Sequence, residues 1–372
     1  MRLDAFAAEL DLCSRCHEQC LFASPVVLAS GRHTLAPSRV ALLLDLFRRG
    51  ELAPSEDLAE VMALGIGSGI EHEHCLYVGR ARWPDETLYA RAGRADLVDR
   101  GFLVPAARNA VERIAATGDA FGLGPNPDAL LLAGRTLFFT DAATRALSPA
   151  TATAFHAVVR QVEHDVQPLP VMMAALPSSA GYEPLELGLE AHARRLAGSL
   201  VAFARSMGAT AIVSESPEAL VALKSTGAAQ NLTLLHASEW LDGLGAGGAG
   251  RGLATVAVQR PPRVAVLHDS ARLGRYLGVY DPPRRILRSL QGLEFREMTR
   301  AREAATPSGP TFGYSNAEAS AAMAQRALDE VMAVGAQLII TTSAYDRRNF
   351  AAVAGAEIEV VDLVDLVAEM TG

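Results

Sequence analysis

The sequence lacks cysteine over most of its length. All four cysteines lie in the first 75 of the 372 residues, and none follows Cys75. Clustered thiols in a cytosolic chain are more typical of metal or catalytic sites than of structural disulfides. The distribution therefore predicts a single metal site in the N-terminal part.

Long apolar runs and a surplus of basic residues are also missing. No run approaches the roughly 18 apolar residues needed to span a bilayer, and the start, Met1-Arg2-Leu3-Asp4-Ala5, lacks the basic-then-apolar order of a secretory signal. The net charge of −8, from 34 Lys and Arg against 42 Asp and Glu, has the wrong sign for a general nucleic-acid binder. We expect a cytoplasmic chain with no transmembrane segment and no nucleic-acid partner.

Three of the cysteines form a compact group, Cys13-Ser-Arg-Cys16-His-Glu-Gln-Cys20. One irregular loop with this spacing can wrap around a soft metal or a cluster, but a fourth ligand must come from elsewhere. In two-cluster ferredoxins this ligand comes from the downstream cysteine motif. Cys75 is the only thiol that can take this role. Zinc held by four thiolates, a redox-active cysteine pair and separate buried cysteines are the alternatives.

The coarse pattern divides the chain into a helical part and an α/β part. Apolar residues have helical spacing over 40–47 and 58–64, and the cysteines fall in loops between such helices. Glycine and proline over 122–127 interrupt this pattern, and 129–133 then predicts a buried strand. We therefore assign 1–120 to a helical module.

Beyond the module, apolar strands alternate with alanine-rich helices, which is typical of parallel α/β units. A predicted helix over 189–207 leads into a strand over 208–214, and a helix over 316–334 leads into a strand over 335–341. This repetition predicts two related halves, 121–242 and 253–372, joined by a Gly-rich linker over 243–252. The linker matches Gly-x-Gly-x-x-Gly, but it follows a helix pattern and precedes a strand pattern at 255–258, the reverse of a dinucleotide-binding turn.

The order of these parts resembles a known family, and a motif in the last third carries the likeness. His268-Asp-Ser-Ala-Arg-Leu-Gly-Arg275 resembles the His-Asp-Pro-Cys-Arg-Leu-Gly-Arg of iron–sulfur oxidoreductase subunits, and 280–287 and 292–298 continue in register. These subunits join a two-cluster ferredoxin module to two cysteine-rich CCG domains. They include glycolate oxidase iron–sulfur subunits, anaerobic glycerol-3-phosphate dehydrogenase small subunits, lactate-utilisation proteins and heterodisulfide reductase subunits. The resemblance implies an α/β fold: a helical ferredoxin-like module, then two related CCG-like domains with mainly parallel sheets.

The chain departs from this family at the cysteines. Pro307-Ser-Gly309 and Ser179-Ala-Gly181 stand where Cys-Cys-Gly is expected, and the run 342–350, with Ser343 and Asp346, replaces Cys-Pro-x-Cys. Neither half can then bind a thiolate-ligated cluster. In the module, the resemblance assigns four positions to the ligands of the second cluster, and none of them is a cysteine: Ser24, Gly65, Ser68 and Glu71.

The four surviving cysteines correspond, in the resemblance, to the ligands of the first cluster. This implies one [4Fe-4S] cluster held by Cys13, Cys16, Cys20 and Cys75, with zinc as the alternative metal. Neighbouring His17, His72 and His74 are ordinary polar loop residues or hydrogen-bond donors to sulfur. The second half, 253–372, could bind an anion or cofactor where its cluster is missing, or it could keep family residues for packing and surface ion pairs. The candidate residues are His268, Asp269, Arg272, Arg275 and Tyr345.

The resemblance implies an electron-transfer subunit rather than a stand-alone catalyst. Such a subunit would relay single electrons within a flavin-dependent oxidoreductase complex, as a hetero-oligomer with a flavoprotein dehydrogenase or an electron-transfer flavoprotein. A non-redox assembly subunit with structural zinc is one alternative. A protein that binds a ligand in the emptied α/β clefts is the other.

Overall fold

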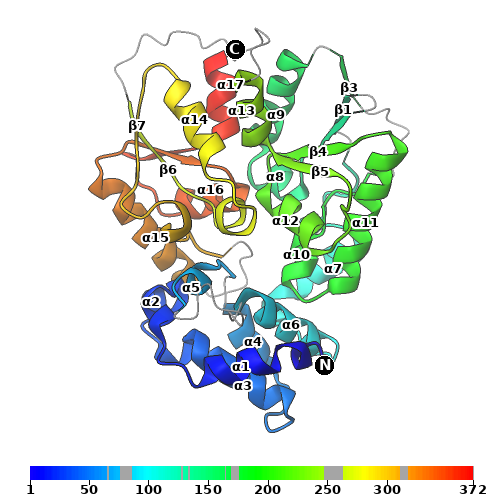
Figure 1. The fold of residues 1–372 in the computed structure, drawn as a ribbon, viewed down its shortest axis with the longest axis vertical. Coiled ribbons are helices and arrows are strands. Elements are labelled where there is room, and N and C mark those ends of the chain that lie inside the picture. Colours follow the sequence, from blue (N-terminus) through cyan, green and yellow to red (C-terminus); the bar gives the residue numbers. More distant parts are fainter. Residues whose placement is uncertain are drawn as a thin grey trace.

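A computed structural model describes residues 1–64, 67–75, 86–126, 129–132, 135–163, 165–168, 176–246, 263–310 and 317–371. A helical module lies at one end of the molecule, and two α/β units lie side by side at the other (Figure 1). Within these ranges, no helix combines the length and apolar character needed to cross a membrane.

The N-terminal module is built from helices. Proline at the first position starts α3, and Val40, Ala41, Leu44 and Phe47 then point into the core at helical spacing. The module's elements are η1 (Arg2–Phe6), α1 (Ala7–Ser14), η2 (Gln19–Phe22), α2 (Pro25–Ser30), η3 (His33–Leu35), α3 (Pro37–Arg48), α4 (Glu56–Leu64), α5 (Ile70–Glu73), α6 (Glu86–Val98), η4 (Pro105–Ala107) and α7 (Arg108–Thr117). The predicted helices at 40–47 and 58–64 are therefore present as α3 and α4.

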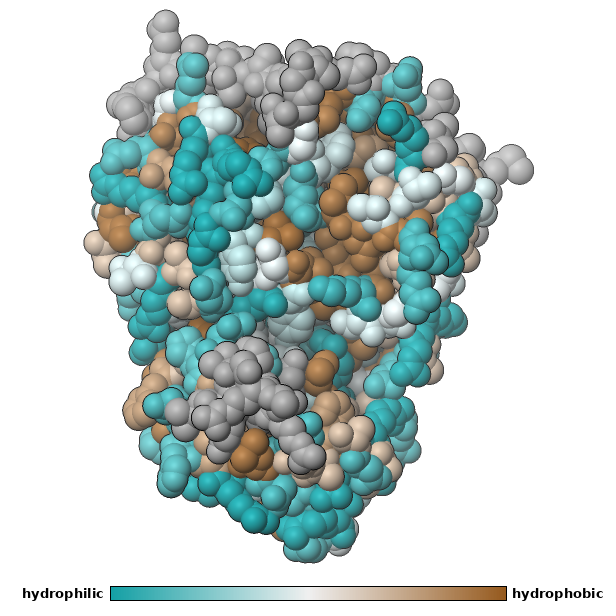
Figure 2. Space-filling model, viewed as in Figure 1, coloured by the Kyte–Doolittle hydropathy of each residue, from teal (hydrophilic) through white to brown (hydrophobic). Residues whose placement is uncertain are grey.

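The first α/β unit contains a five-stranded sheet of order β3-β1-β2-β4-β5. Strand β1 pairs antiparallel with β2 and β3, whereas β2, β4 and β5 run parallel. Its elements are β1 (Leu130–Leu132), β2 (Thr136–Phe138), α8 (Ala142–Leu147), α9 (Pro149–Val162), β3 (Val166–Pro168), α10 (Tyr182–Glu186), α11 (Glu190–Ser206), β4 (Ala211–Ser214), α12 (Pro217–Ser225), β5 (Thr233–His236) and α13 (Ala237–Ala246). Figure 2 shows apolar side chains gathering over β4 and β5, where Leu234 and Leu235 of the edge strand are half-buried.

The second unit contains a four-stranded sheet of order β7-β6-β8-β9, and all its pairs are parallel. The elements are β6 (Arg263–Leu267), the π-helical segment η5 (Arg272–Tyr276), α14 (Asp281–Ser289), β7 (Leu293–Arg296), η6 (Arg302–Ala304), α15 (Ala317–Ala333), β8 (Leu338–Thr341), α16 (Ala344–Ala351), β9 (Glu359–Asp362) and α17 (Leu363–Thr371). Polar residues follow the carboxyl ends of β6 and β8, the edge at which open parallel sheets usually carry their sites.

The mixed α/β class predicted from the sequence is confirmed. Helix α11 precedes β4 and β5 in one unit, and helix α15 precedes β8 and β9 in the other. Parallel pairing, however, extends to every strand only in the second sheet. The predicted linker also begins too early, because α13 continues to Ala246 with Leu241 and Leu244 packed in the core. Residues 247–252 and the predicted strand at 255–258 lie outside the described residues.

Candidate metal centre

The four cysteines lie on the N-terminal module. Cys13 is in α1, Cys16 follows that helix, Cys20 is in η2, and Cys75 follows α5. All four are thiols rather than disulfides, and all are partly exposed. Helix η2 packs against α5, which brings the turn with Cys20 next to the segment that ends at Cys75. The Sγ atom of Cys13 lies 3.4 Å from the hydroxyl of Tyr89 on α6.

The four thiols match a metal cluster in chemistry. Thiolates are the usual ligands of a [4Fe-4S] cluster, and four of them also form a structural zinc site. Among the described residues, no three His, Cys, Asp or Glu side chains are grouped closely enough to hold a metal ion. The residues that would hold a cluster are thus of the right chemical type and lie on adjoining segments.

The structure brings together three of the positions that the resemblance assigns to a second cluster. Ser24, Ser68 and Glu71 are all buried. The hydroxyls of Ser68, at 3.3 Å, and of Ser24 both hydrogen-bond to the Glu71 carboxylate. Burial raises the pKa of Glu71, against these bonds and the charge of Arg275. A closed polar network thus occupies this position; the fourth residue, Gly65, lies outside the described residues.

A larger network occupies the positions that the resemblance assigns to the cysteines of two CCG domains. Ser179 donates to Glu183 at 3.0 Å, and Ser343 donates to Glu218 at 2.7 Å. Tyr345 also donates to Glu183, at 2.7 Å, so bonds cross between the two α/β units. We call this group the buried serine–acid network; its members are Ser179, Glu183, Glu218, Ser308, Ser343, Tyr345 and Asp346, with Ser308 donating to Asp346.

Burial changes the acidity of the carboxyl groups in and around this network. It raises the pKa of Glu218 to about 7, and the neighbouring charge of Asp346 adds to this effect. It likewise raises the pKa of Glu215 to about 7 and raises that of Glu183. Burial acts to raise the pKa of Asp346 as well. The neighbouring His268 lowers this pKa by more, so the pKa of Asp346 lies below its usual value. Within the network, Glu218 therefore keeps its proton up to about neutral pH, whereas Asp346 loses its proton more readily than an ordinary aspartic acid.

The five residues proposed for a residual cleft do not share one site. His268 Nε2 lies 3.6 Å from Asp346, and Tyr345 belongs to the buried serine–acid network. Asp269 instead accepts two bonds from Arg284, both at 2.7 Å. Arg272 and Arg275 bond to backbone carbonyls of the N-terminal module. Glu183 and Glu218 were not predicted from the sequence, because they lie outside the motifs that carry the resemblance. Arg284 lies within 280–287, which continues the motif, but its pairing with Asp269 depends on tertiary packing and was not predicted.

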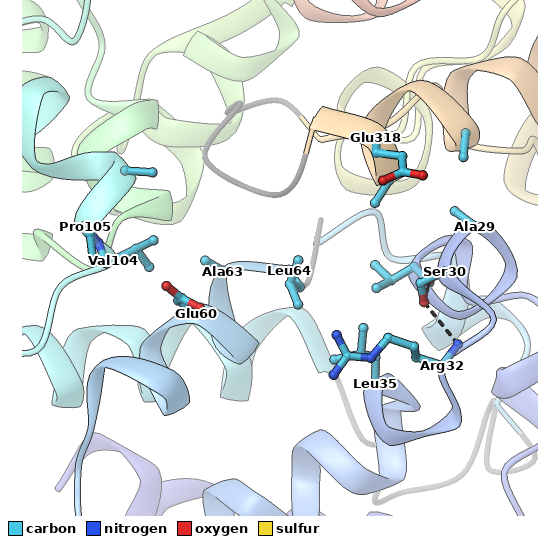
Figure 3. Close-up of a pocket in the computed structure, with 14 residues that line it drawn as sticks. Ala29, Ser30, Arg32, Leu35, Glu60, Ala63, Leu64, Val104, Pro105 and Glu318 are labelled. Atoms are coloured by element: carbon cyan, nitrogen blue, oxygen red, sulfur yellow. Dashed lines mark hydrogen bonds between the residues drawn. The ribbon is translucent and has the colours of Figure 1, made fainter.

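A separate pocket of about 640 Å³ opens where the module meets α15. Figure 3 shows Arg32 and Ser30 on one side of it, Glu318 opposite, and Glu60 and Leu64 from α4. Its walls are mostly small apolar side chains. None of the cysteines and none of the residual-cleft residues lines it.

Comparison with known proteins agrees with the motif at His268–Arg275. Residues 265–345 match the family described as the cysteine-rich domain CCG. A protein of Methanosarcina barkeri that belongs to the dihydromethanophenazine:CoB–CoM heterodisulfide reductase is 29% identical over 110 residues, which is 28% of this chain and 27% of the relative. The corresponding protein of Methanosarcina acetivorans is 28% identical over 115 residues, 30% of this chain and 28% of the relative.

A shorter match with a higher identity involves a bacterial protein. The probable iron-sulfur-binding oxidoreductase FadF of Bacillus subtilis is 58% identical over 36 residues, 10% of this chain and 5% of the relative. The chain thus spans less than a third of the length of each of these relatives. The resemblance to iron–sulfur oxidoreductase subunits predicted from the sequence is confirmed.

Proposed function

Because the chain is related to the iron–sulfur oxidoreductase subunits that carry CCG domains, we propose that it is an electron-transfer subunit with one [4Fe-4S] cluster. Its ligands would be Cys13, Cys16, Cys20 and Cys75. One observation supports this proposal most: thiols remain at one ligand set only, whereas the described residues at the other cluster positions include buried, hydrogen-bonded oxygen side chains. A cluster with four thiolate ligands would supply one-electron transfer without an open iron for substrate.

The protein's own residues have three tasks in this proposal. The cysteines bind the cluster on the partly exposed face of the module. The buried serine–acid network fills the emptied CCG positions and keeps further metal out. The α/β units provide the scaffold on which a flavoprotein dehydrogenase or an electron-transfer flavoprotein would dock, within a cytoplasmic hetero-oligomer. Outer-sphere transfer needs this docking surface and no catalytic acid or base.

Replacing Cys75 by serine is expected to remove most of the iron from the protein. Wild-type protein purified without oxygen should be brown and contain about four irons per chain, whereas Cys75→Ser leaves the cluster with three thiolates. Iron and acid-labile sulfide are measured on both proteins, together with the electron paramagnetic resonance (EPR) spectrum after reduction.

Ser308→Ala is the matched control for this variant. Ser308 lies at an emptied CCG position in the other half of the chain, so its loss should leave the iron content unchanged. Equal iron in wild type and Cys75→Ser would refute the ligand set. Colourless wild-type protein with one zinc per chain would contradict the electron-transfer proposal and support a structural zinc site.

A further inference from the structure

Two arginines of the CCG motif contact the N-terminal module instead of an emptied cluster site. Both lie on η5, the π-helical segment that follows β6. Arg272 Nη1 donates to the carbonyl of Gly67, and Arg275 Nε donates to the carbonyl of Ser68 at 2.7 Å. The Tyr276 hydroxyl donates to the Gly67 carbonyl as well, at 2.5 Å. Three donors on one short segment therefore hold two successive carbonyls of the module.

These carbonyls belong to the turn that leads to Cys75. Gly67 and Gly69 have φ angles of 55° and 73°, the left-handed conformation that glycine adopts without strain. Helix α5 follows directly, and its turn is closed by bonds from Glu73 N to Gly69 O and from His74 N to Ile70 O, each of 3.2 Å. The next bond, from Cys75 N to the His72 carbonyl, is also 3.2 Å long. Hydrogen bonds of α5 thus begin at Gly69, the residue that follows the fixed carbonyls, and continue to the cysteine.

The arginines are themselves held rigidly. Arg272 is 2% exposed and lies against the rings of Tyr182 and Tyr276, with its guanidinium carbon 5.5 and 4.8 Å from their centroids. Glu186 lies nearby and is bound by Arg91 at 2.5 Å and Arg94 at 3.1 Å, both from α6. Burial acts to raise the pKa of Glu186, but Arg91, Arg94 and Arg272 lower it to about 2. Residues from the module and both α/β units therefore meet around Arg272.

Arg275 is anchored from its other side. Its Nη1 donates to the carbonyls of Glu303 and Ala305, at 2.9 and 3.1 Å, in and next to η6. A guanidinium with donors on both edges suits such a role, because it can bridge two backbone segments in a fixed plane. A lysine at this position would provide the charge but could not make the same bridge.

We propose that Arg272 and Arg275 are positioning residues for the metal centre: they fix the Gly67–Ser68 turn and so orient Cys75 toward the other three cysteines. This inference rests on the ligand set of the proposed function. It gives the second CCG-like unit a role that requires no cysteine. In this role the unit acts on the cluster through backbone carbonyls and not as a ligand.

The test measures the turn and the cluster separately. Arg275→Gln removes the bond to Ser68, and Tyr276→Phe removes one bond to Gly67 while keeping the ring against Arg272. In metal-free protein, amide hydrogen exchange of the 67–75 segment should be faster by about fivefold to tenfold in each variant, the effect of one lost hydrogen bond. In iron-loaded protein, Arg275→Gln should hold less iron and give a broadened or shifted EPR spectrum. Arg275→Lys should restore the signal in part.

Arg285→Gln is the matched control, because Arg285 lies on nearby α14 with its side chain 55% exposed and pairs with Asp242 at the surface. It should change neither measurement. Unchanged hydrogen exchange in both Arg275→Gln and Tyr276→Phe would overturn the proposal. Faster hydrogen exchange together with an unchanged EPR spectrum and iron content would overturn it as well. If wild-type protein binds no iron, the proposed function fails, while the exchange data still decide whether the turn is held. If Arg275→Gln does not fold, Tyr276→Phe decides alone.

Discussion

Replacing Arg284 by methionine is expected to lower the free energy of unfolding by about 3–5 kcal/mol, the usual cost of breaking a buried ion pair on one side. The Arg284 side chain is fully buried and makes two bonds of 2.7 Å to Asp269. It also donates to Glu297 at 2.9 Å. Methionine fills part of the volume but removes the cation that faces the buried Asp269 carboxylate, which keeps its bond from the Arg302 amide at 2.7 Å. Urea denaturation followed by circular dichroism measures the change.

Arg288→Met is the control for this variant, because Arg288 lies on the same helix and also pairs with Glu297, at 3.2 Å. Its side chain is 58% exposed, so we expect a loss below about 1 kcal/mol. The double variant Asp269→Asn, Arg284→Met should lose less than the sum of the single losses, since no unpaired charge remains. Equal losses for Arg284→Met and Arg288→Met would contradict the buried pair.

The contribution of Glu215 and Glu218 to the stability of the protein is expected to fall as the pH rises from about 4.5 to about 7. Burial raises the pKa of Glu215 and of Glu218 from 4.5 to about 7. In this window the folded chain keeps protons that the unfolded chain has lost, so the free energy of unfolding decreases with pH. A shift of this size corresponds to roughly 3 kcal/mol for Glu218, fully lost above its folded-state pKa. Calorimetry between pH 5 and 8 measures the trend.

Glu218→Gln isolates the contribution of one carboxyl. Glutamine keeps the size of the side chain and can still accept the bond from Ser343, but it cannot ionise. The variant should therefore be more stable than wild type at pH 8, by about 1–3 kcal/mol, and no more stable near pH 5. Glu112→Gln, at an exposed position on α7, is the control and should show no such gain. A gain that does not depend on pH would refute the buried ionisation.

Periodicity predicted the elements that bury one continuous apolar face. Helices α11 and α15 were predictable because alanine and leucine recur at helical spacing before a short apolar strand. The antiparallel pairing of β1 with β2 and β3 was not predictable, since three-residue strands carry too little pattern to indicate direction. Their pairing depends on tertiary contacts, as is usual for β-structure.

The hydrogen-bond partners of the serines at the CCG cysteine positions could not be predicted for a different reason. Glu218 follows Ser216 and Pro217 in the first turn of α12, where an acid ordinarily caps a helix and stays in water. Glu218 is only 1% exposed, and this burial depends on the packing of the other α/β unit. A local sequence pattern carries no information about such packing. The same holds for Arg272 and Arg275, for which the alternative to binding a ligand was packing and surface ion pairs. Their acceptors lie in a module about two hundred residues earlier in the chain.

The contact between η5 and the Gly67–Ser68 turn also bears on how such a chain can change during evolution. Its acceptors are main-chain oxygens, which every amino acid possesses, so the contact places almost no demand on side-chain identity in the module. Only the backbone conformation of Gly67, with positive φ, restricts the choice. Cysteines at positions such as 68 and 71 could therefore be replaced by serine or glutamate while the arginines kept their bonds to the backbone carbonyls. If the proposed cluster is held by the four cysteines, a second cluster could thus be lost without weakening the contact that positions Cys75.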